Sequence, residues 1–141
     1  MGFFKDLAKL AGENARIKRT ANQESSLNPQ ERQILEDVRE RIRQGDSDAM
    51  FQLGGYYIHG KYVGYDPSQA CHWWTEAANL GHSDAMYNLG ILYHGNLSAH
   101  YYDENLAGHW FHMAASNGDQ EAADMLQQYE YGSFRKKWSK R

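Results

Sequence analysis

The sequence repeats itself with a period of 36 to 37 residues, and this repeat constrains the fold more than any other feature. The segment that begins at Gly45 returns at Gly81 and, with weaker similarity, at Gly118. Further positions match at the same shifts: Leu53 and Leu89, Gly54 and Gly90, Tyr57 and Tyr93, Asp66 and Asp103, Ala70 and Ala107, Trp73 and Trp110. A period of this length indicates stacked supersecondary units that share one continuous core. We therefore predict three units, at residues 45–80, 81–117 and, in part, 118–131.

Each unit is predicted to contain two helices, of which the first spans roughly residues 47–59 in the first unit. Apolar residues such as Ala49 and Leu53 recur there at spacings of three and four, which is typical of an amphipathic helix. Gly60 follows this helix and Gly95 follows its counterpart. Both glycines are expected to end their helices in the left-handed conformation.

The second helix of the first unit is predicted to span roughly residues 67–80, with Asp66 as its N-cap and Pro67 in its first turn. Gly54 and Gly90 lie within the first helices of their units, where glycine costs about 1 kcal/mol relative to alanine. This repeated cost indicates that a facing helix lies too close for a side chain. Small residues at Ala70, Ala77 and Ala78 are expected to let helices approach closely, with Trp73 filling the space opposite them.

The repeated residues resemble the Sel-one-like repeat, a relative of the tetratricopeptide repeat, over about residues 45–131. The matching positions are Ala49, Leu53, Gly54, Tyr57, Gly60, Asp66, Ala70, Trp73, Ala77 and Ala78. The chain departs from the family pattern at Gln69 and Leu106, where lysine is usual, and in the loop 96–102. The resemblance implies an all-α protein, a right-handed α-solenoid of antiparallel helix pairs. It also implies a non-enzymatic scaffold or adaptor for protein–protein interaction.

The segments that flank the repeats are predicted to form separate elements. Residues 28–44 begin with a capping box at Asn28 and should form a capping helix that covers the first repeat. Residues 1–20 should form an amphipathic helix with these residues on its apolar side: Phe3, Phe4, Leu7, Leu10 and Ala11. This helix has three alternative uses, which are a membrane surface, the solenoid itself and another copy of the chain. Residues 132–141 form a basic tail.

The net charge of −3 conceals an acidic body between basic ends. Residues 44–132 contain one basic and eleven acidic residues, a net charge of −10, whereas residues 133–141 carry +5 and residues 1–43 carry +2. Such a body selects partners by charge. We expect a protein or peptide partner of basic character and no nucleic acid. No apolar run is long enough for a membrane span and the first residues are charged, so we expect a cytoplasmic protein.

No residue pattern in the sequence indicates catalysis or a bound cofactor. The single cysteine, Cys71, excludes a disulfide within the chain and a zinc site built from thiolates. The seven histidines lie between positions 59 and 112, and four of them recur at matched positions, His72 with His109 and His59 with His94, which favours structural roles over metal ligation. Ser133 and Lys136 have the spacing of a β-lactam-type hydrolase, but the companion motifs are missing from the sequence. We predict no catalytic, cofactor-binding or metal-binding residues.

The resemblance also implies where a partner binds, because the first helix of each unit lines the concave side of the family's solenoids. The residues implied to face a partner polypeptide are Asp48, Phe51, Gln52, Asp84, Tyr87, Asn88, Ile91, Asp124 and Gln128. Aromatic rings bury area, amides bond a peptide backbone and carboxylates select basic side chains. The alternative for several of these residues is packing against the second helix of the next unit.

Overall fold

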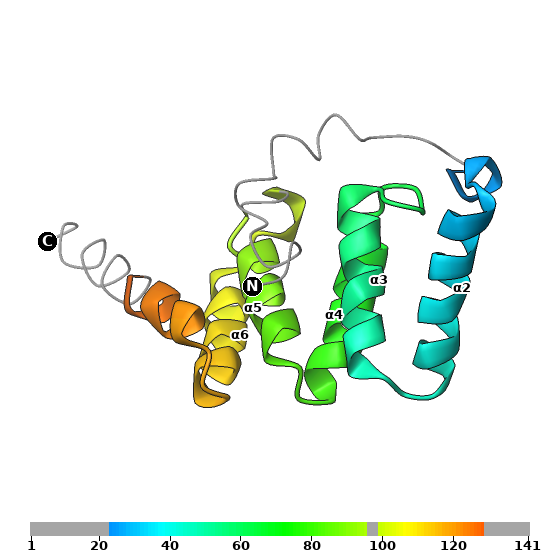
Figure 1. The fold of residues 1–141 in the computed structure, drawn as a ribbon. Helices are drawn as coiled ribbons and strands as arrows, with labels where there is room; N and C mark the ends of the chain where they lie inside the picture. The colour runs from blue at the N-terminus through cyan, green and yellow to red at the C-terminus, as the bar shows by residue number, and fades with distance from the viewer. Residues whose placement is uncertain (1–22, 96–98, 129–141) are drawn as a thin grey trace, which may run out of the picture.

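A computed structural model of the protein describes residues 23–95 and 99–128 (Figure 1). These residues form helices and no strand. In chain order the elements are the 3₁₀ helix η1 (Gln23–Ser26), α2 (Pro29–Arg43), α3 (Ser47–His59), α4 (Pro67–Asn79), α5 (Ser83–Tyr93), the 3₁₀ helix η2 (Ala99–Tyr101), α6 (Glu104–Ser116) and a last helix that covers residues 120–128. The predicted amphipathic helix at residues 1–20 and the basic tail at residues 132–141 lie outside the described residues.

The helices stack in pairs, as the repeat predicts. The most extensive contacts join α3 to α4 and α5 to α6, so each complete repeat unit is one antiparallel helix pair (Figure 1). The pairs are joined to each other through α4 and α5, and α2 packs on α3 at the start of the stack. The protein is therefore an all-helical solenoid of the predicted class.

Helix α2 closes the first end of the core with two residues, Leu35 and Val38, which are buried in one apolar cluster with residues of α3 such as Leu53. A capping box at Asn28 starts this helix: the Asn28 side chain accepts from the Glu31 N–H, and the Asn28 N–H donates to the Glu31 carboxylate, both at 2.9 Å. Ile34, which lies 36 residues before the buried Ala70, is 40% exposed.

The turn that joins one helix pair to the next is the same at three places in the chain. Gly45, Gly81 and Gly118 have φ angles of 82°, 89° and 89°. The N–H of each glycine donates over 2.9 Å to the carbonyl three residues earlier, and the next N–H donates over 3.0–3.1 Å to the carbonyl five residues earlier. Only glycine adopts such a φ without strain. The turns place the N-termini of α3, α5 and helix 120–128 along one edge of the stack (Figure 1).

An aromatic ring packs on a helical glycine in each unit. A Cβ atom on Gly54 would lie 2.5 Å from Cδ1 and Nε1 of Trp74, and a Cβ atom on Gly90 would lie 2.5 Å from Cε1 of Phe111. Trp74 and Phe111 are both fully buried. The close approach inferred from the two glycines is thus present, and a side chain of the facing helix makes it.

The rings that meet the glycines lie one position after the repeated tryptophans that the sequence analysis singled out. Trp73 is only half-buried, and its ring lies in a T-shaped contact with the ring of His72, at a centroid distance of 4.9 Å. Trp110 makes the same contact with His109, at 5.2 Å. The glycine contacts come from the next residue along each helix, because one step of about 100° turns that side chain into the core.

A candidate polypeptide-binding surface

The edge of the stack described above is built from helix N-caps. Asp46 accepts from the N–H groups of Asp48 and Ala49 at the start of α3, over 2.9 and 3.3 Å. Asp119 accepts from the Ala122 N–H over 3.0 Å at the start of helix 120–128. Each cap satisfies donors that the first turn of a helix leaves without a partner, and each adds negative charge where the helix dipole favours it.

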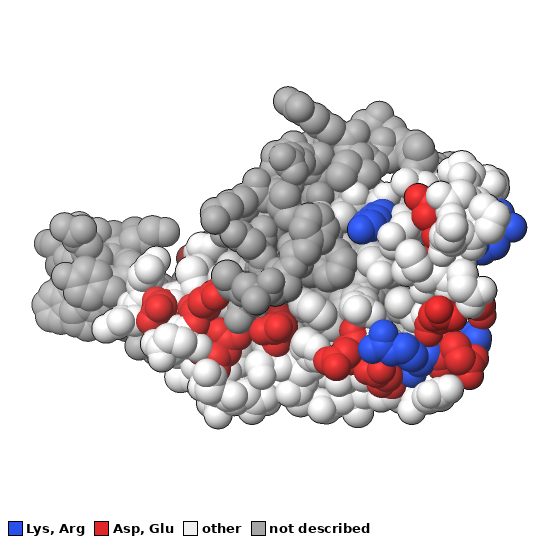
Figure 2. Space-filling model, viewed as in Figure 1, with Lys and Arg blue, Asp and Glu red and all other residues white. Residues whose placement is uncertain are grey.

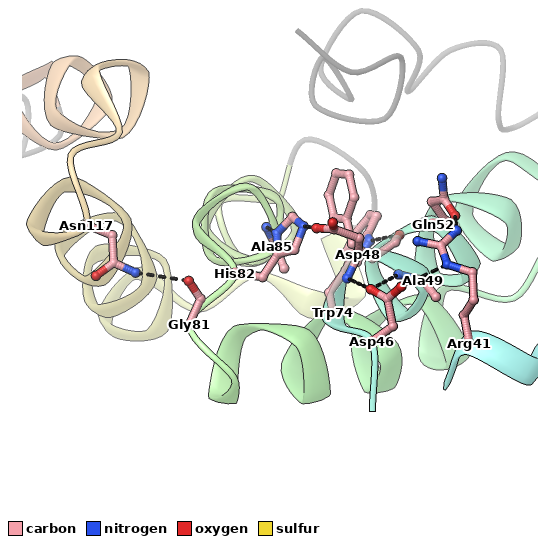
Figure 3. A network of polar contacts seen from close by, with 11 residues as sticks. Arg41, Asp46, Asp48, Ala49, Gln52, Trp74, Gly81, His82, Ala85 and Asn117 are labelled. Atoms are coloured by element: carbon pink, nitrogen blue, oxygen red, sulfur yellow. Dashed lines mark hydrogen bonds and ion pairs between the residues drawn. The ribbon is translucent and has the colours of Figure 1, made fainter. Parts of the chain in front are cut away.

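Arg41 of α2 holds the first of these caps in place. Its Nε donates to the Asp46 carboxylate over 2.8 Å, and its Nη1 donates to Oε1 of Gln52 over 3.1 Å (Figure 3). The hydrogen bond from Arg41 is the main reason that the pKa of Asp46 lies below its usual value, and the helix N–H groups lower it further. The Asp46 cap therefore stays ionised at neutral pH.

In the second unit a histidine takes the cap position. Nδ1 of His82 accepts from the Ala85 N–H over 3.2 Å, and Nε2 of His82 lies 3.0 Å from the Asp48 carboxylate (Figure 3). Because Nδ1 is an acceptor, we assign the proton to Nε2, which donates to Asp48. The ring of Phe51 stacks on the His82 ring at a centroid distance of 4.6 Å. One side chain thus caps α5 and ties it to α3.

Two shallow cavities follow one another along this edge. The first has a volume of about 340 Å³ and is lined by residues 47–48 and 80–84, and the second, also of about 340 Å³, is lined by residues 83–84 and 117–121. The two linings correspond to each other through the repeat, and Asp84 belongs to both. Figure 2 shows acidic side chains along this part of the molecule, with basic ones gathered toward the α2 end. The repeat therefore presents a row of carboxylates beside two small hollows.

The predicted partner-facing residues fall into two groups in the structure. In α3, Asp48 and Gln52 lie four residues apart on one side, and in α5 Asp84, Asn88 and Ile91 lie on the corresponding side. We call this the groove side of α3 and α5. The residues with surface left for a partner are Asp48, Gln52, Asp84, Tyr87, Asp124 and Gln128. The Asp48 side chain is 74% exposed.

Three predicted partner-facing residues are buried instead. Phe51 is 8% exposed, Asn88 is 0% and Ile91 is 2% exposed. Phe51 packs on His82, its carbonyl accepts from Trp74 Nε1 over 3.2 Å, and Ile91 belongs to the main apolar cluster. The three residues therefore pack within the protein, although Phe51 contacts Trp74 of its own unit's second helix and His82 rather than the second helix of the next unit.

A separate cavity of about 500 Å³ lies where the described chain begins, between η1, α2 and the end of α3. Its lining includes Gln23, Glu31 and residues 59–62. His59 is buried there, and burial, with a smaller contribution from Lys61, lowers the pKa of His59 to about 4. Tyr62 has a φ of 65°, a positive value that is unusual for a residue with a side chain.

The role of His82 was visible in the repeat, although no motif pointed to it. His82 aligns with the capping residues Asp46 and Asp119, so the repeat itself marks it as an N-cap. Cys71 lies between α4 and α5, where its Sγ is 3.4 Å from Oη of Tyr93. Within residues 23–95 and 99–128, no group of three or more His, Cys, Asp or Glu side chains is arranged to hold a metal ion.

Comparisons with known proteins agree with this geometry. The Sel1 repeat family matches the chain twice, at residues 47–82 and 83–119, which together make up more than half of its length. No solved structure matches the chain. In the part of the chain that the structure describes, no helix is long and apolar enough to cross a membrane. Sel1 repeats are generally protein-interaction modules. The chain belongs to the Sel1 repeat family.

Proposed function

We propose that the protein is a non-enzymatic scaffold that binds a basic segment of a partner polypeptide along the groove side of α3 and α5. The observation that carries the proposal is the repeated pair of acid-lined cavities at the N-termini of α3, α5 and helix 120–128. A cavity that recurs with the repeat suits a ligand that is itself a chain, because successive units can hold successive residues.

The charges on this side favour a ligand rich in lysine and arginine. Asp48, Asp84 and Asp124 lie on the helices that form the edge, and residues 44–132 contain only one basic residue, Lys61. Carboxylates on a partly exposed surface attract basic side chains and raise the rate of encounter. Tyr87 adds a half-buried ring that a peptide side chain can contact.

Selection from a random peptide library on the immobilised full chain tests the proposal. We expect the selected peptides to be enriched in lysine and arginine and to be released by a rise in salt concentration, because exposed charge pairs are screened. A double variant, Asp48→Asn with Asp84→Asn, should retain fewer of these peptides. The matched control, Glu76→Gln with Glu104→Gln, removes the same charge from α4 and α6 and should retain them all. Selection of peptides without basic enrichment would contradict the proposal.

A further inference from the structure

The contact between His82 and Asp48 joins the N-cap of α5 to a carboxylate of the candidate surface (Figure 3). The His82 side chain is only 12% exposed, whereas the Asp48 side chain is 74% exposed. The imidazole is therefore enclosed, and the ring of Phe51 stacks on it. It presents Nε2 to a carboxylate that remains open to a partner.

The repeat shows that this arrangement belongs to one of the two cavities. The cap positions of α3 and of helix 120–128 hold Asp46 and Asp119, whose carboxylates accept from helix N–H groups. Among these three caps only His82 has a second nitrogen, which reaches the preceding unit. The cavity that His82 lines also contains Asp48 and Asp84, whereas the lining of the second cavity holds three acidic residues and no histidine.

Gain of a proton by the His82 imidazole would change both of its contacts. A neutral imidazole accepts at one nitrogen and donates at the other, whereas the protonated ring donates at both. The protonated ring therefore loses the hydrogen bond from the Ala85 N–H and becomes a cation 3.0 Å from the Asp48 carboxylate. The charge of Asp48 is then compensated from within the protein, so a basic partner is attracted less.

The titratable groups around His82 are carboxylates. Helix α3 carries Asp48 and, two residues earlier, Asp46, which Arg41 of α2 holds at 2.8 Å. Helix α5 contributes Asp84 to the same cavity, and the turn after α4 contributes no titratable group. Imidazole is the side chain that ordinarily changes charge between pH 5 and pH 8. In this range the charge of the cavity is therefore altered by its histidine and not by its carboxylates.

We propose that His82 is a positioning residue for Asp48 and makes the binding of the basic segment depend on pH, so that the partner is released as the imidazole gains a proton. This inference rests on the proposed function, since it names the regulation of the same surface. At neutral pH, His82 donates to Asp48 and holds its carboxylate at the cavity. In mildly acidic solution the imidazolium pairs with that carboxylate and competes with the basic side chains of the partner.

Titration of the full chain with a histidine-free peptide from the library selection, at pH 7.5 and at pH 5.5, tests the release. We expect the affinity to fall about two- to fivefold at the lower pH, as for the loss of one exposed charge pair. The variant His82→Asn should remove most of this fall and still fold, because asparagine is a preferred N-cap residue and does not titrate. The matched control His72→Asn, at an exposed position of α4, should keep the fall. An equal fall in His82→Asn and in the unchanged protein would overturn the proposal.

Nuclear magnetic resonance of the full chain tests the contact itself without any partner. At pH 7.5, ¹⁵N spectra of the imidazoles should show His82 protonated at Nε2 and not at Nδ1. As the pH falls, the Ala85 amide signal should shift with the same midpoint as the His82 ring, because the ring ceases to be its acceptor. In His82→Asn this shift should be absent. Protonation at Nδ1 at pH 7.5, or an Ala85 signal that ignores the titration of the ring, would overturn the proposal.

The two measurements separate this inference from the proposed function. If basic peptides bind with the same affinity at both pH values, the proposed function stands and the role of His82 falls. If no basic peptide is selected while the Ala85 signal follows the His82 ring, the proposed partner and its release fall, and the pH-dependent contact with Asp48 stands.

Discussion

In the first repeat unit the ring of Trp74 lies on Gly54, and in the second unit the ring of Phe111 lies on Gly90. In both contacts a Cβ atom on the glycine would lie 2.5 Å from the ring. Only the indole of Trp74 also donates a hydrogen bond, to the Phe51 carbonyl. The repeat therefore requires a large flat ring at this position and not a particular residue. The units also differ at their edges, where Asp46 caps α3 and His82 caps α5.

This difference shows which parts of a unit the stack determines. The buried ring and the facing glycine recur because both units pack in the same way. The cap residues vary because any acceptor can satisfy the first turn of a helix. His82 caps α5 through Nδ1, and its Nε2 also contacts Asp48 of the preceding unit.

Removal of the buried rings should have the largest effect on stability. Trp74→Ala and Phe111→Ala should each lower the free energy of unfolding by about 3–5 kcal/mol. The tryptophan variant should be the more damaging, because it also removes a buried hydrogen bond worth about 1 kcal/mol. Urea unfolding followed by circular dichroism measures both. A larger loss for Phe111→Ala would mean that the two units do not share this contact as described.

The next largest effect is a dependence of the unfolding free energy on pH, which arises in the first unit. His59 precedes Gly60 at the end of α3 and is buried, whereas its counterpart His94, which precedes Gly95, is only half-buried. Since burial lowers the pKa of His59 from 6.5 to about 4, the unfolded chain takes up a proton first as the pH falls. Stability should therefore be full above pH 6.5 and should decrease toward pH 4, by roughly 2–3 kcal/mol from this group.

The variant His59→Gln should flatten this part of the stability profile, as measured by urea unfolding at a series of pH values. The exposed His72 offers a control, since His72→Gln should leave the slope between pH 6.5 and pH 4 as it is in the unchanged protein. An unaltered slope in His59→Gln would show that burial of this imidazole does not control the response.

Addition of one methyl group at each glycine tests the close approach directly. Gly54→Ala and Gly90→Ala would gain about 1 kcal/mol from helix propensity, but the new Cβ would lie 2.5 Å from a buried ring. Overpacking of this kind typically costs about 1–3 kcal/mol, so we expect a net loss of up to about 2 kcal/mol at each position. Thermal unfolding measures it, with Gln69→Ala on the exposed part of α4 as the control. A gain in stability at either glycine would rule out the rigid contact.

The smallest expected effect is the loss of a helix N-cap, which should lower the stability of both units equally. Asp66 caps α4 and Asp103 caps α6, each through two N–H groups at 3.0–3.2 Å. Asp66→Ala and Asp103→Ala should each lower the unfolding free energy by about 1 kcal/mol. Chemical denaturation of the two variants side by side checks this, and clearly unequal losses would show that one of the caps has a further role.

The repeat made the helices predictable, because its glycines, caps and apolar spacing all recur. The predicted start of α3 at residue 47 and of α4 at residue 67 agree with the structure. The sequence did not single out the rings that meet the glycines, for a physical reason. Identity between units singled out Trp73 and Trp110, whereas the core selects ring volume, which Trp74 and Phe111 share without being identical.

The candidate surface was only partly predictable for a related reason. The side of α3 and α5 that carries Asp48 and Asp84 follows from helical spacing. The burial of Asn88 and Ile91 does not follow from it, because burial depends on what covers that side as well as on where the helix points. Likewise, the contact between His82 and Asp48 depends on the packing of two units and not on any local pattern.

The central claim is that the acidic groove side of α3 and α5 binds a basic polypeptide. Titration of the full chain with the strongest peptide from the library selection, at low salt, tests it most directly. We predict that Asp48→Asn with Asp84→Asn weakens binding roughly three- to tenfold, as expected for the loss of two exposed charge pairs. Glu76→Gln with Glu104→Gln should not change the affinity. Equal affinities for all three proteins would contradict the claim.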